Sequence, residues 1–260
     1  MAVVTLISDR RVDDFFLGRL KGQLLSTCNN LNIVDLAHNF SHHSVSRAAF
    51  ILKHSFKNFP DNTIHLVGVD GECSEIKKHL IAKVNNQYFI AADNGLFSLS
   101  FEHDEIQEII EVDTCIHEIP KIPALFTFGK IACEIIRGKD IFEFGKIATN
   151  VKRLMPFNPT FGKDYILGHV VYIDSYQNAV TDISFELFSE LSKGRQFFIT
   201  PGIPKYKITT IHNSYHDVKP GEVIVIFNSL GLLEVAMNKG NISELYSFNL
   251  ETQIRIDFKD

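Results

Sequence analysis

Aspartates follow two of the strands that the sequence predicts. Asp9 follows the apolar run 2–7 with one residue between them, and Asp70 comes directly after the alternating run 63–69. In open α/β sheets, ligands bind beyond the carboxyl ends of the strands. An ionised aspartate at position 9 can accept two hydrogen bonds from vicinal hydroxyls such as those of a ribose. The alternative for Asp9 and for Asp70 is the first residue of a turn, and both interpretations stay open at this point.

Polar side chains also gather at turns later in the chain. Asp93-Asn94-Gly95 form a tight turn before a short predicted helix, which favours an Asx turn over a carboxylate-binding loop. Asn178, Asn228 and Ser229 offer amide and hydroxyl contacts, and Tyr176 could stack on a base. Taken singly, each of these is more typical of a turn or hairpin.

Composition limits the class of protein. The 260 residues are 45% hydrophobic and 22% charged, which is typical of a globular chain with a sizeable core. A net charge of −5 without a basic run gives no support for a nucleic-acid partner. No apolar stretch approaches the roughly 20 residues of a membrane-spanning helix. Charges at Asp9 and Arg10 come too early for a signal peptide, so the predicted location is the cytoplasm.

The four cysteines are scattered and form no Cys-x-x-Cys pair. They are Cys28, Cys73, Cys115 and Cys133. This spacing predicts reduced thiols in a cytoplasmic protein rather than disulfides or a zinc site.

The first part of the chain, residues 1–155, alternates strand and helix patterns. Asp13 is expected to cap the first helix, whose apolar side is predicted to contain Phe16, Leu20, Leu24 and Leu25. The other predicted elements are a second strand at 32–37, a helix from 44, strands at 63–69, 79–84, 87–92 and 106–112, and a helix at 127–137 ending at Gly138. This order predicts an α/β layered domain with a central, mostly parallel sheet.

The character changes near residue 155, where a segment rich in proline, glycine and aromatics reads as a linker. Strands are predicted at 165–173, 178–183, 195–199, 206–211, 222–227, 232–237 and 252–258, and a helix only at 185–193. Residues 156–260 are therefore predicted to form a smaller, all-β, barrel-like domain.

Several common site motifs are absent from the sequence. There is no G-x-G-x-x-G, no G-x-x-x-x-G-K-[ST], no G-x-S-x-G and no H-E-x-x-H. The sequence therefore predicts neither a resident cofactor nor a metal site.

Four segments, taken together and in order, carry a recognisable pattern over nearly the whole chain. Their residues are Thr5, Leu6, Ser8, Asp9 and Asp14; Tyr88-Phe89-Ile90 with Asp93-Asn94-Gly95-Leu96; Ile173, Asp174, Tyr176, Asn178, Thr181 and Ile183; and Asn228, Ser229, Gly231, Leu233, Val235, Ala236 and Asn238. This pattern resembles that of the S-adenosylmethionine hydroxide adenosyltransferases, relatives of the fluorinase and chlorinase enzymes.

The resemblance implies a homotrimer with ligand sites between neighbouring subunits. It implies that Asp9 holds the ribose hydroxyls of S-adenosylmethionine and that Tyr176 and Tyr215 pack near the nucleoside. It further implies that Asn178, Asn228 and the backbone from Met237 to Lys239 contact adenine, and that Ser229 contacts the methionine end. Asp14 and Asp174 belong to the same matched motifs, so they join the predicted ligand-binding residues.

The chain departs from the family around the expected attacking water. Asp70 is kept, but Lys77 stands where the hydrolytic members have arginine, and Pro123 stands where they have histidine. Lysine keeps the charge and loses the planar fork of arginine. His43 and His117 are the candidates to replace that histidine as a polar partner. Ala124 takes the slot of the serine that binds halide in the halogenating relatives, so halogenation is not expected.

The predicted activity is hydrolysis of S-adenosylmethionine, in which water or hydroxide attacks ribose C5′ to give adenosine and L-methionine. Asp70 and Lys77 are the predicted catalytic residues. The first alternative is a protein of the same fold that binds S-adenosylmethionine or adenosine without turnover. The second is a fold retained for an unrelated ligand or for assembly.

Overall fold

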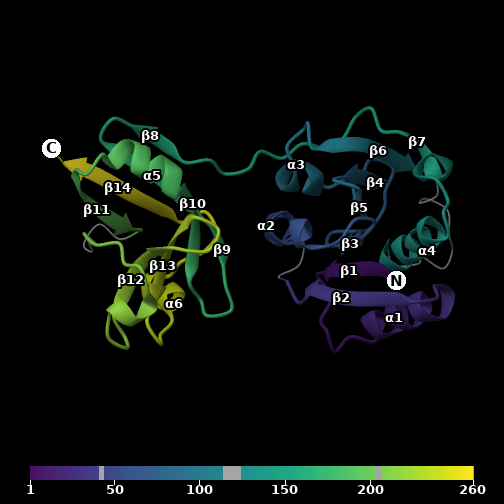
Figure 1. The fold of residues 1–260 in the computed structure, drawn as a ribbon, viewed down its shortest axis with the longest axis horizontal. Helices are drawn as coiled ribbons and strands as arrows, with labels where there is room; N and C mark the ends of the chain where they lie inside the picture. Colours follow the sequence, from purple (N-terminus) through teal and green to yellow (C-terminus); the bar gives the residue numbers. More distant parts are fainter. Residues whose placement is uncertain (41–43, 114–123, 203–206, 260) are drawn as a thin grey trace. The chain divides into compact units, whose positions relative to one another are not determined.

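The structure is a computed structural model that describes residues 1–40, 44–113, 124–202 and 207–259. The chain folds as two compact units, Met1–Met155 and Pro156–Asp260 (Figure 1). Each unit is described by itself below.

The described residues of the first unit form a seven-stranded sheet in the order β2-β1-β3-β5-β4-β6-β7. Its strands are β1 (Ala2–Ser8), β2 (Leu31–Ala37), β3 (Ile64–Gly68), β4 (His79–Val84), β5 (Gln87–Ala92), β6 (Ile106–Val112) and β7 (Gly145–Ile147). The neighbours β2, β1, β3 and β5 are parallel, whereas β4, β6 and β7 extend the sheet by antiparallel pairing. The site described below lies at the carboxyl ends of the parallel strands.

Helices cover both faces of this sheet. Helices α1 (Phe15–Thr27) and α4 (Ala124–Ile136) pack on one face, and α2 (Val45–Ser55) and α3 (Leu96–Ser100) pack on the other (Figure 1). Two short 3₁₀ turns, Phe56–Asn58 and Ile141–Phe144, complete the unit. Leu6 packs in the apolar core on the side of α1 and α4, and its neighbour Ile7 packs in the core on the side of α2 and α3. Strand β1 is therefore buried on both sides. This double burial explains its continuous apolar run.

The start of helix α1 differs from the prediction. The N-cap is Asp14, whose Oδ1 accepts the backbone N–H of Phe16 at 3.2 Å, whereas Asp13 forms an exposed ion pair with Arg11. The apolar face is also shifted, because Leu17 is buried and Leu25 is exposed. Two adjacent aspartates offer the same capping chemistry, so the sequence did not distinguish them.

The described residues of the second unit form an antiparallel sheet in the order β11-β14-β9-β10-β13-β12, with β8 beside β9. The strands are β8 (Thr160–Gly162), β9 (Tyr165–Ile173), β10 (Ala179–Ser184), β11 (Gln196–Pro201), β12 (Val223–Phe227), β13 (Leu232–Met237) and β14 (Gln253–Lys259). The sheet curls into a half-barrel around a core to which α5 (Phe185–Ser192) contributes partly buried side chains. The predicted fold class, an α/β domain followed by a smaller barrel-like β domain, is confirmed.

Two predictions for this unit were wrong. The described part of 206–211 forms no strand and makes only an isolated bridge between Ile208 and Ile199. Helix α6 (Ile242–Tyr246) was missed, because five residues are too few to show a helical period. Its N-cap Asn241 accepts the N–H of Glu244, a local signal that was available in the sequence. None of the helices in the described part of the chain is long and apolar enough to cross a membrane.

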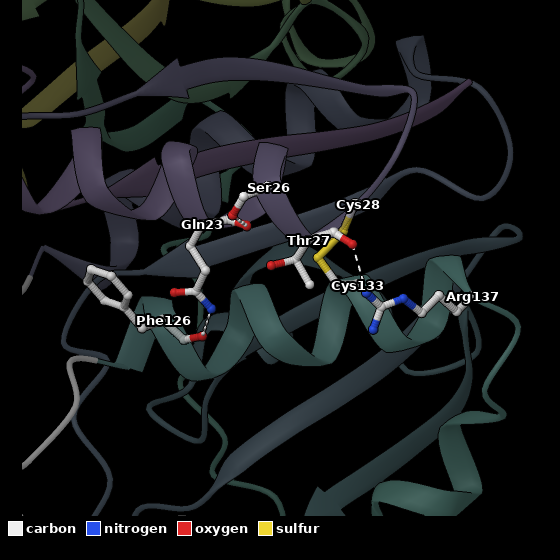
Figure 2. The surroundings of a disulfide bond; sticks show 7 residues. All are labelled: Gln23, Ser26, Thr27, Cys28, Phe126, Cys133 and Arg137. Atoms are coloured by element: carbon white, nitrogen blue, oxygen red, sulfur yellow. Dashed lines mark hydrogen bonds between the residues drawn. A yellow bond between two sulfur atoms is a disulfide. The ribbon is translucent and has the colours of Figure 1, made fainter.

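The prediction of reduced thiols is wrong for Cys28, Cys73 and Cys133, which are all disulfide-bonded. Cys28, at the C-terminal end of α1, forms a disulfide with Cys133 of α4 across 105 positions of sequence (Figure 2). The same two helices are joined by hydrogen bonds from Arg137 to the Thr27 carbonyl at 2.7 Å and from Gln23 to the Phe126 carbonyl. The pairing was not visible in the sequence because it depends on how two distant helices pack. Cys115 lies outside the described residues.

Replacing both disulfide cysteines by alanine should lower the free energy of unfolding by about 2–5 kcal/mol, because a long closed loop no longer restricts the unfolded chain. Urea denaturation without reductant measures this change. Ser26→Ala, an exposed change beside the disulfide, serves as the control. Unchanged stability of the double variant, with both thiols of the parent open to alkylation, would contradict the pairing.

A buried polar chain links three parallel strands. His65 Nδ1 lies 2.7 Å from Thr5 Oγ1, and His65 Nε2 lies 2.7 Å from Gln87 Oε1. The Gln87 amide nitrogen donates to the carbonyls of Phe56 and Phe59, so its oxygen faces the histidine. His65 therefore donates from Nε2 and accepts at Nδ1, which assigns the neutral tautomer. Burial is the largest cause that lowers the pKa of His65, to about 4.

Folding stability should fall as the pH drops from 6.5 towards 4, because the unfolded chain binds a proton at His65 that the folded chain excludes. The shift corresponds to about 3 kcal/mol lost by pH 4. Urea denaturation at pH 7 and pH 4.5 measures the loss, and His65→Gln should show a smaller loss than the parent. The exposed His103→Gln is the control and should keep the parent's pH dependence. Equal pH dependence in all three proteins would refute the assignment.

Candidate active site

The carboxyl ends of β1, β3 and β5 meet at one edge of the first sheet. Ser8 pairs with Gly68, and Val67 pairs with Ala91, so the segments that follow these strands are neighbours. The backbone N–H of Asp70 donates to Asp9 Oδ2 at 3.2 Å. The structure therefore brings the two aspartates singled out in the sequence into direct contact.

Asp70 has a left-handed backbone with φ +43°, a conformation that costs free energy in a residue with a side chain. The surrounding residues hold it. Asn94 Nδ2 donates to the Val69 carbonyl at 2.8 Å and lies 3.4 Å from the Asp70 carbonyl oxygen. Asp70 is thus both a turn residue and a residue of the candidate site, and the two interpretations are compatible.

Lys77 lies at the end of the loop that follows Asp70, and its side chain binds Asp70. Its Nζ donates to Asp70 Oδ1 at 2.7 Å and to the Asp70 carbonyl oxygen at 3.0 Å. A local turn positions it, since the Lys77 N–H donates to Ser74 Oγ and the Ser74 N–H donates to the Lys77 carbonyl. The side chains of Lys77 and Asp70 are 22% and 30% exposed, so solvent reaches the pair. An accessible carboxylate beside an ammonium can orient a water molecule and accept its proton.

His79 stabilises the same turn, and no sequence pattern indicated this role. Its buried ring hydrogen-bonds through Nε2 to the Gly71 carbonyl at 2.9 Å and packs edge-on against Phe128 of α4. Burial lowers the pKa of His79, which favours the neutral ring. A Cβ on Gly71 would lie 3.2 Å from the Cβ of Ala124, so the start of α4 lies against the turn.

A second histidine that the sequence analysis missed lies at the end of β2. His38 Nδ1 lies 2.8 Å from Ser8 Oγ, and His38 Nε2 lies 3.1 Å from Asp35 Oδ1. The hydroxyl of Ser8 is buried, so this arrangement links the ends of β1 and β2 rather than offering a nucleophile. An Asp-x-x-His spacing at a strand end was the available signal.

The predicted Asx turn at 93–95 is confirmed, because Asn94 Oδ1 accepts the N–H of Leu96 at 3.1 Å. Asp93 Oδ1 accepts the N–H of Lys152 at 2.8 Å, and burial raises the pKa of Asp93. Gly95 has φ +96°, and a Cβ there would lie 2.4 Å from Leu154, so glycine fits both the backbone and the space. Asp14 caps α1, and its predicted ligand contact stays a prediction.

In the second unit, Asp174 and Asn178 close a tight turn between β9 and β10. Asp174 Oδ1 accepts the Asn178 N–H at 2.8 Å, and Oδ2 accepts Asn178 Nδ2 at 3.1 Å. Ser243 Oγ donates to the Gln177 carbonyl at 2.7 Å and fixes the outer side of the turn. Tyr176, at the tip, is 79% exposed, so its ring is available to stack on a planar ligand.

Asn228 organises the turn between β12 and β13. Its Oδ1 accepts the N–H groups of Leu230 and Leu232, and its Nδ2 donates to Glu234 at 3.1 Å. Ser229 is exposed at this turn. The Tyr215 hydroxyl also donates to Glu234, a buried residue that the sequence analysis did not single out.

Met237 and Lys239 belong to the turn after β13. The N–H of Gly240 donates to the Met237 carbonyl at 3.2 Å, and Lys239 has φ +54° and an exposed side chain. His43, His117 and Pro123 lie outside the described residues. Among the residues that are described, no cluster of His, Cys, Asp or Glu could hold a metal ion.

Comparison with known proteins decides the family. The model of the SAM hydroxide adenosyltransferase N-terminal domain matches residues 4–145, and that of the C-terminal domain matches residues 168–255. The chain belongs to the SAM hydroxide adenosyltransferase family. The resemblance inferred from the four sequence segments is therefore confirmed.

Relatives of this chain match over nearly its full length. The (R)-S-adenosyl-L-methionine hydrolase of Methanocaldococcus jannaschii is 23% identical over 265 residues, covering 98% of this chain and 95% of that protein. The enzyme of the same name from Thermus thermophilus is 21% identical, covering 98% of this chain and all of that protein. A solved structure of a conserved Thermotoga maritima protein has the same fold, with a TM-score of 0.85, 24% identity, and coverage of 99% of this chain and 100% of that one.

Proposed function

We propose that this protein hydrolyses S-adenosylmethionine to adenosine and L-methionine. The observation that carries the proposal is the joining of Asp9, Asp70, Lys77 and Asn94 at the carboxyl ends of three parallel strands. Family membership and full-length relatives named as (R)-S-adenosyl-L-methionine hydrolases support the same activity.

In this proposal the reaction is a displacement at ribose C5′. A water oxygen forms a bond to C5′ while the C5′–S bond breaks. The electron pair of the C5′–S bond stays on the sulfur of the departing methionine. The proton of the attacking water passes to the Asp70 carboxylate and then to solvent. The positive sulfonium becomes a neutral thioether, so a site that excludes bulk water favours the transition state.

Several of the predicted residues have a role in this mechanism. Asp9 uses Oδ2 to hold the Asp70 backbone, and we assign its other oxygen to the ribose hydroxyls. Lys77 orients the Asp70 carboxylate as a point charge, since lysine lacks the fork of arginine. In the second unit, Tyr176, Tyr215 and Asn178 are assigned to the nucleoside.

A binding protein without turnover is the second candidate. The observation that favours it is that the Lys77 ammonium is already bound to both the carboxylate and the carbonyl oxygen of Asp70. An ammonium bound in this way occupies a carboxylate oxygen that the attacking water would otherwise contact. The third possibility from the sequence, an unrelated ligand, gains no support from the family match.

Purified protein incubated with S-adenosylmethionine should release adenosine and methionine in equal amounts, as measured by mass spectrometry. In water labelled with ¹⁸O, the label should appear in adenosine, because water attacks C5′. Asp70→Asn should lower kcat at least about 100-fold through loss of the proton acceptor. Added chloride should leave adenosine as the product.

The matched control is Asp104→Asn, an exposed aspartate outside the site, which should keep the parent rate. Product formation that is equal in the parent and in Asp70→Asn would reject the assigned chemistry. Calorimetric binding of S-adenosylmethionine without any product would establish the binding protein instead.

We also propose a homotrimer with ligand sites between neighbouring subunits, as the family resemblance implies. Light scattering after gel filtration should then give about three times the 29.5 kDa mass of the chain. A monomeric mass at micromolar concentration would reject the trimer. The cytoplasmic location stays a prediction, and the Cys28–Cys133 disulfide bears on it because a reducing cytosol disfavours disulfides.

A further inference from the structure

Glu234 is a buried carboxylate on strand β13 of the second unit. The residue is only 5% exposed to solvent. The Tyr215 hydroxyl donates to Oε1, and Asn228 Nδ2 donates to Oε2 at 3.1 Å. Both carboxylate oxygens are therefore used, by two segments that lie on either side of β12 in the sequence.

Glu234 does not face the main core of its unit. Its neighbours Leu233 and Val235 belong to that core, and side chains alternate between the faces of a strand. Ala236, two residues on, packs with Ile224 and Ile226 in a small cluster on the other face. The segment that carries Tyr215 covers this second face, since Val218 packs against the same cluster.

A second contact anchors the same segment. Asn238, four residues after Glu234 and nearly buried, donates through Nδ2 to the Val218 carbonyl at 2.7 Å. Glu234 and Asn238 thus hold the two ends of the stretch from Tyr215 to Val218. The short 3₁₀ turn within it, Tyr215–Asp217, has a capping box formed by Ser214 and Asp217.

A carboxylate in this position is costly for folding. Burying an ionised group requires hydrogen bonds to offset the lost hydration, and an apolar side chain of similar volume would avoid that cost. The two donors that Glu234 binds, a phenol and an amide, are neutral. Stability alone therefore gives no reason for a glutamate at this position. The reason we infer is that its carboxylate orients the two side chains that bind it.

We propose that Glu234 is a positioning residue of the nucleoside-binding face, which fixes the Tyr215 ring and the Asn228 turn in the orientation that the ligand requires. This inference rests on the proposed function, in which Tyr215 packs against the nucleoside. Tyr215 is 38% exposed, so its ring keeps an accessible surface while its hydroxyl is held. Burial, the hydrogen bond to Glu234 and the charges of Glu234 and Asp174 all raise the pKa of Tyr215.

The assignment gives Asn228 a specific task. Its Oδ1 accepts two backbone N–H groups of its own turn, and its Nδ2 is held by Glu234. Its side chain therefore shapes the turn that presents Ser229.

The test compares Glu234→Gln, Tyr215→Phe and the double variant, with adenosine and S-adenosylmethionine as the probes. Glutamine keeps the shape of glutamate but replaces one acceptor oxygen by a donor, so it cannot accept hydrogen bonds from both Tyr215 and Asn228. We expect each single change to weaken adenosine binding about tenfold and to raise KM with little change in kcat. The double variant should bind no more weakly than the singles, because both changes break the same contact.

Glu190→Gln on the exposed side of α5 is the matched control for loss of charge, and it should bind adenosine as the parent does. Unchanged binding in Tyr215→Phe, which alters no more than one hydroxyl, would overturn the proposal even if Glu234→Gln did not fold. Additive losses in the double variant would also overturn it, since the two residues would then act separately.

A readout that needs no ligand separates this proposal from the proposed function. The chain has seven tyrosines, and Tyr215→Phe identifies the ring-carbon resonance of Tyr215 in ¹³C-tyrosine spectra. Glu234→Gln should shift that resonance, and an unchanged resonance would overturn the positioning role. If the parent binds neither probe, the proposed function fails, whereas the spectra still decide whether Glu234 holds Tyr215.

Discussion

The parallel pairing of β1, β3 and β5 is the constraint on which the candidate site depends. Parallel strands end at the same edge of a sheet, so the residues that follow them are neighbours whatever the length of chain between them. Asp9, Asp70 and Asn94 come together for this reason. The left-handed backbone of Asp70 costs free energy, and hydrogen bonds from the residues at the adjacent strand ends stabilise it. Lys77 and His79 reinforce a geometry that the sheet has already set.

In both units polar groups must be held at fixed positions, and the two units do this in different ways. In the first, an edge of parallel strands gathers polar groups, and α4 lies against the turn that carries them. In the second, antiparallel strands leave polar groups on tight turns, and buried side chains must orient those turns. The Asp174–Asn178 pair and the Glu234 carboxylate do so. The Cys28–Cys133 disulfide fixes α4 to α1 and so restrains the helix next to the first site.

The prediction from sequence succeeded where the signal was local. Alternating or continuous apolar runs predicted most of the strands, including the antiparallel neighbours β4 and β5. It failed where two local choices were equivalent, as with Asp13 and Asp14, or where an element was too short, as with Ile242–Tyr246. Reduced thiols were a reasonable inference from spacing, but spacing carries no information on which helices pack together.

The sequence by itself determined the fold class and the positions at which polar residues interrupt the strands, because periodicity and turn chemistry act over a few neighbouring residues. The family followed from the joint resemblance of four sequence segments, which needs no structure. Only the tertiary structure decided that the Lys77 ammonium binds the backbone as well as the carboxylate of Asp70. It alone joined Cys28 to Cys133 and Tyr215 to Glu234. These contacts link residues that are distant in sequence or on opposite sides of a loop, and their proximity comes from the packing of whole elements, which no local pattern records.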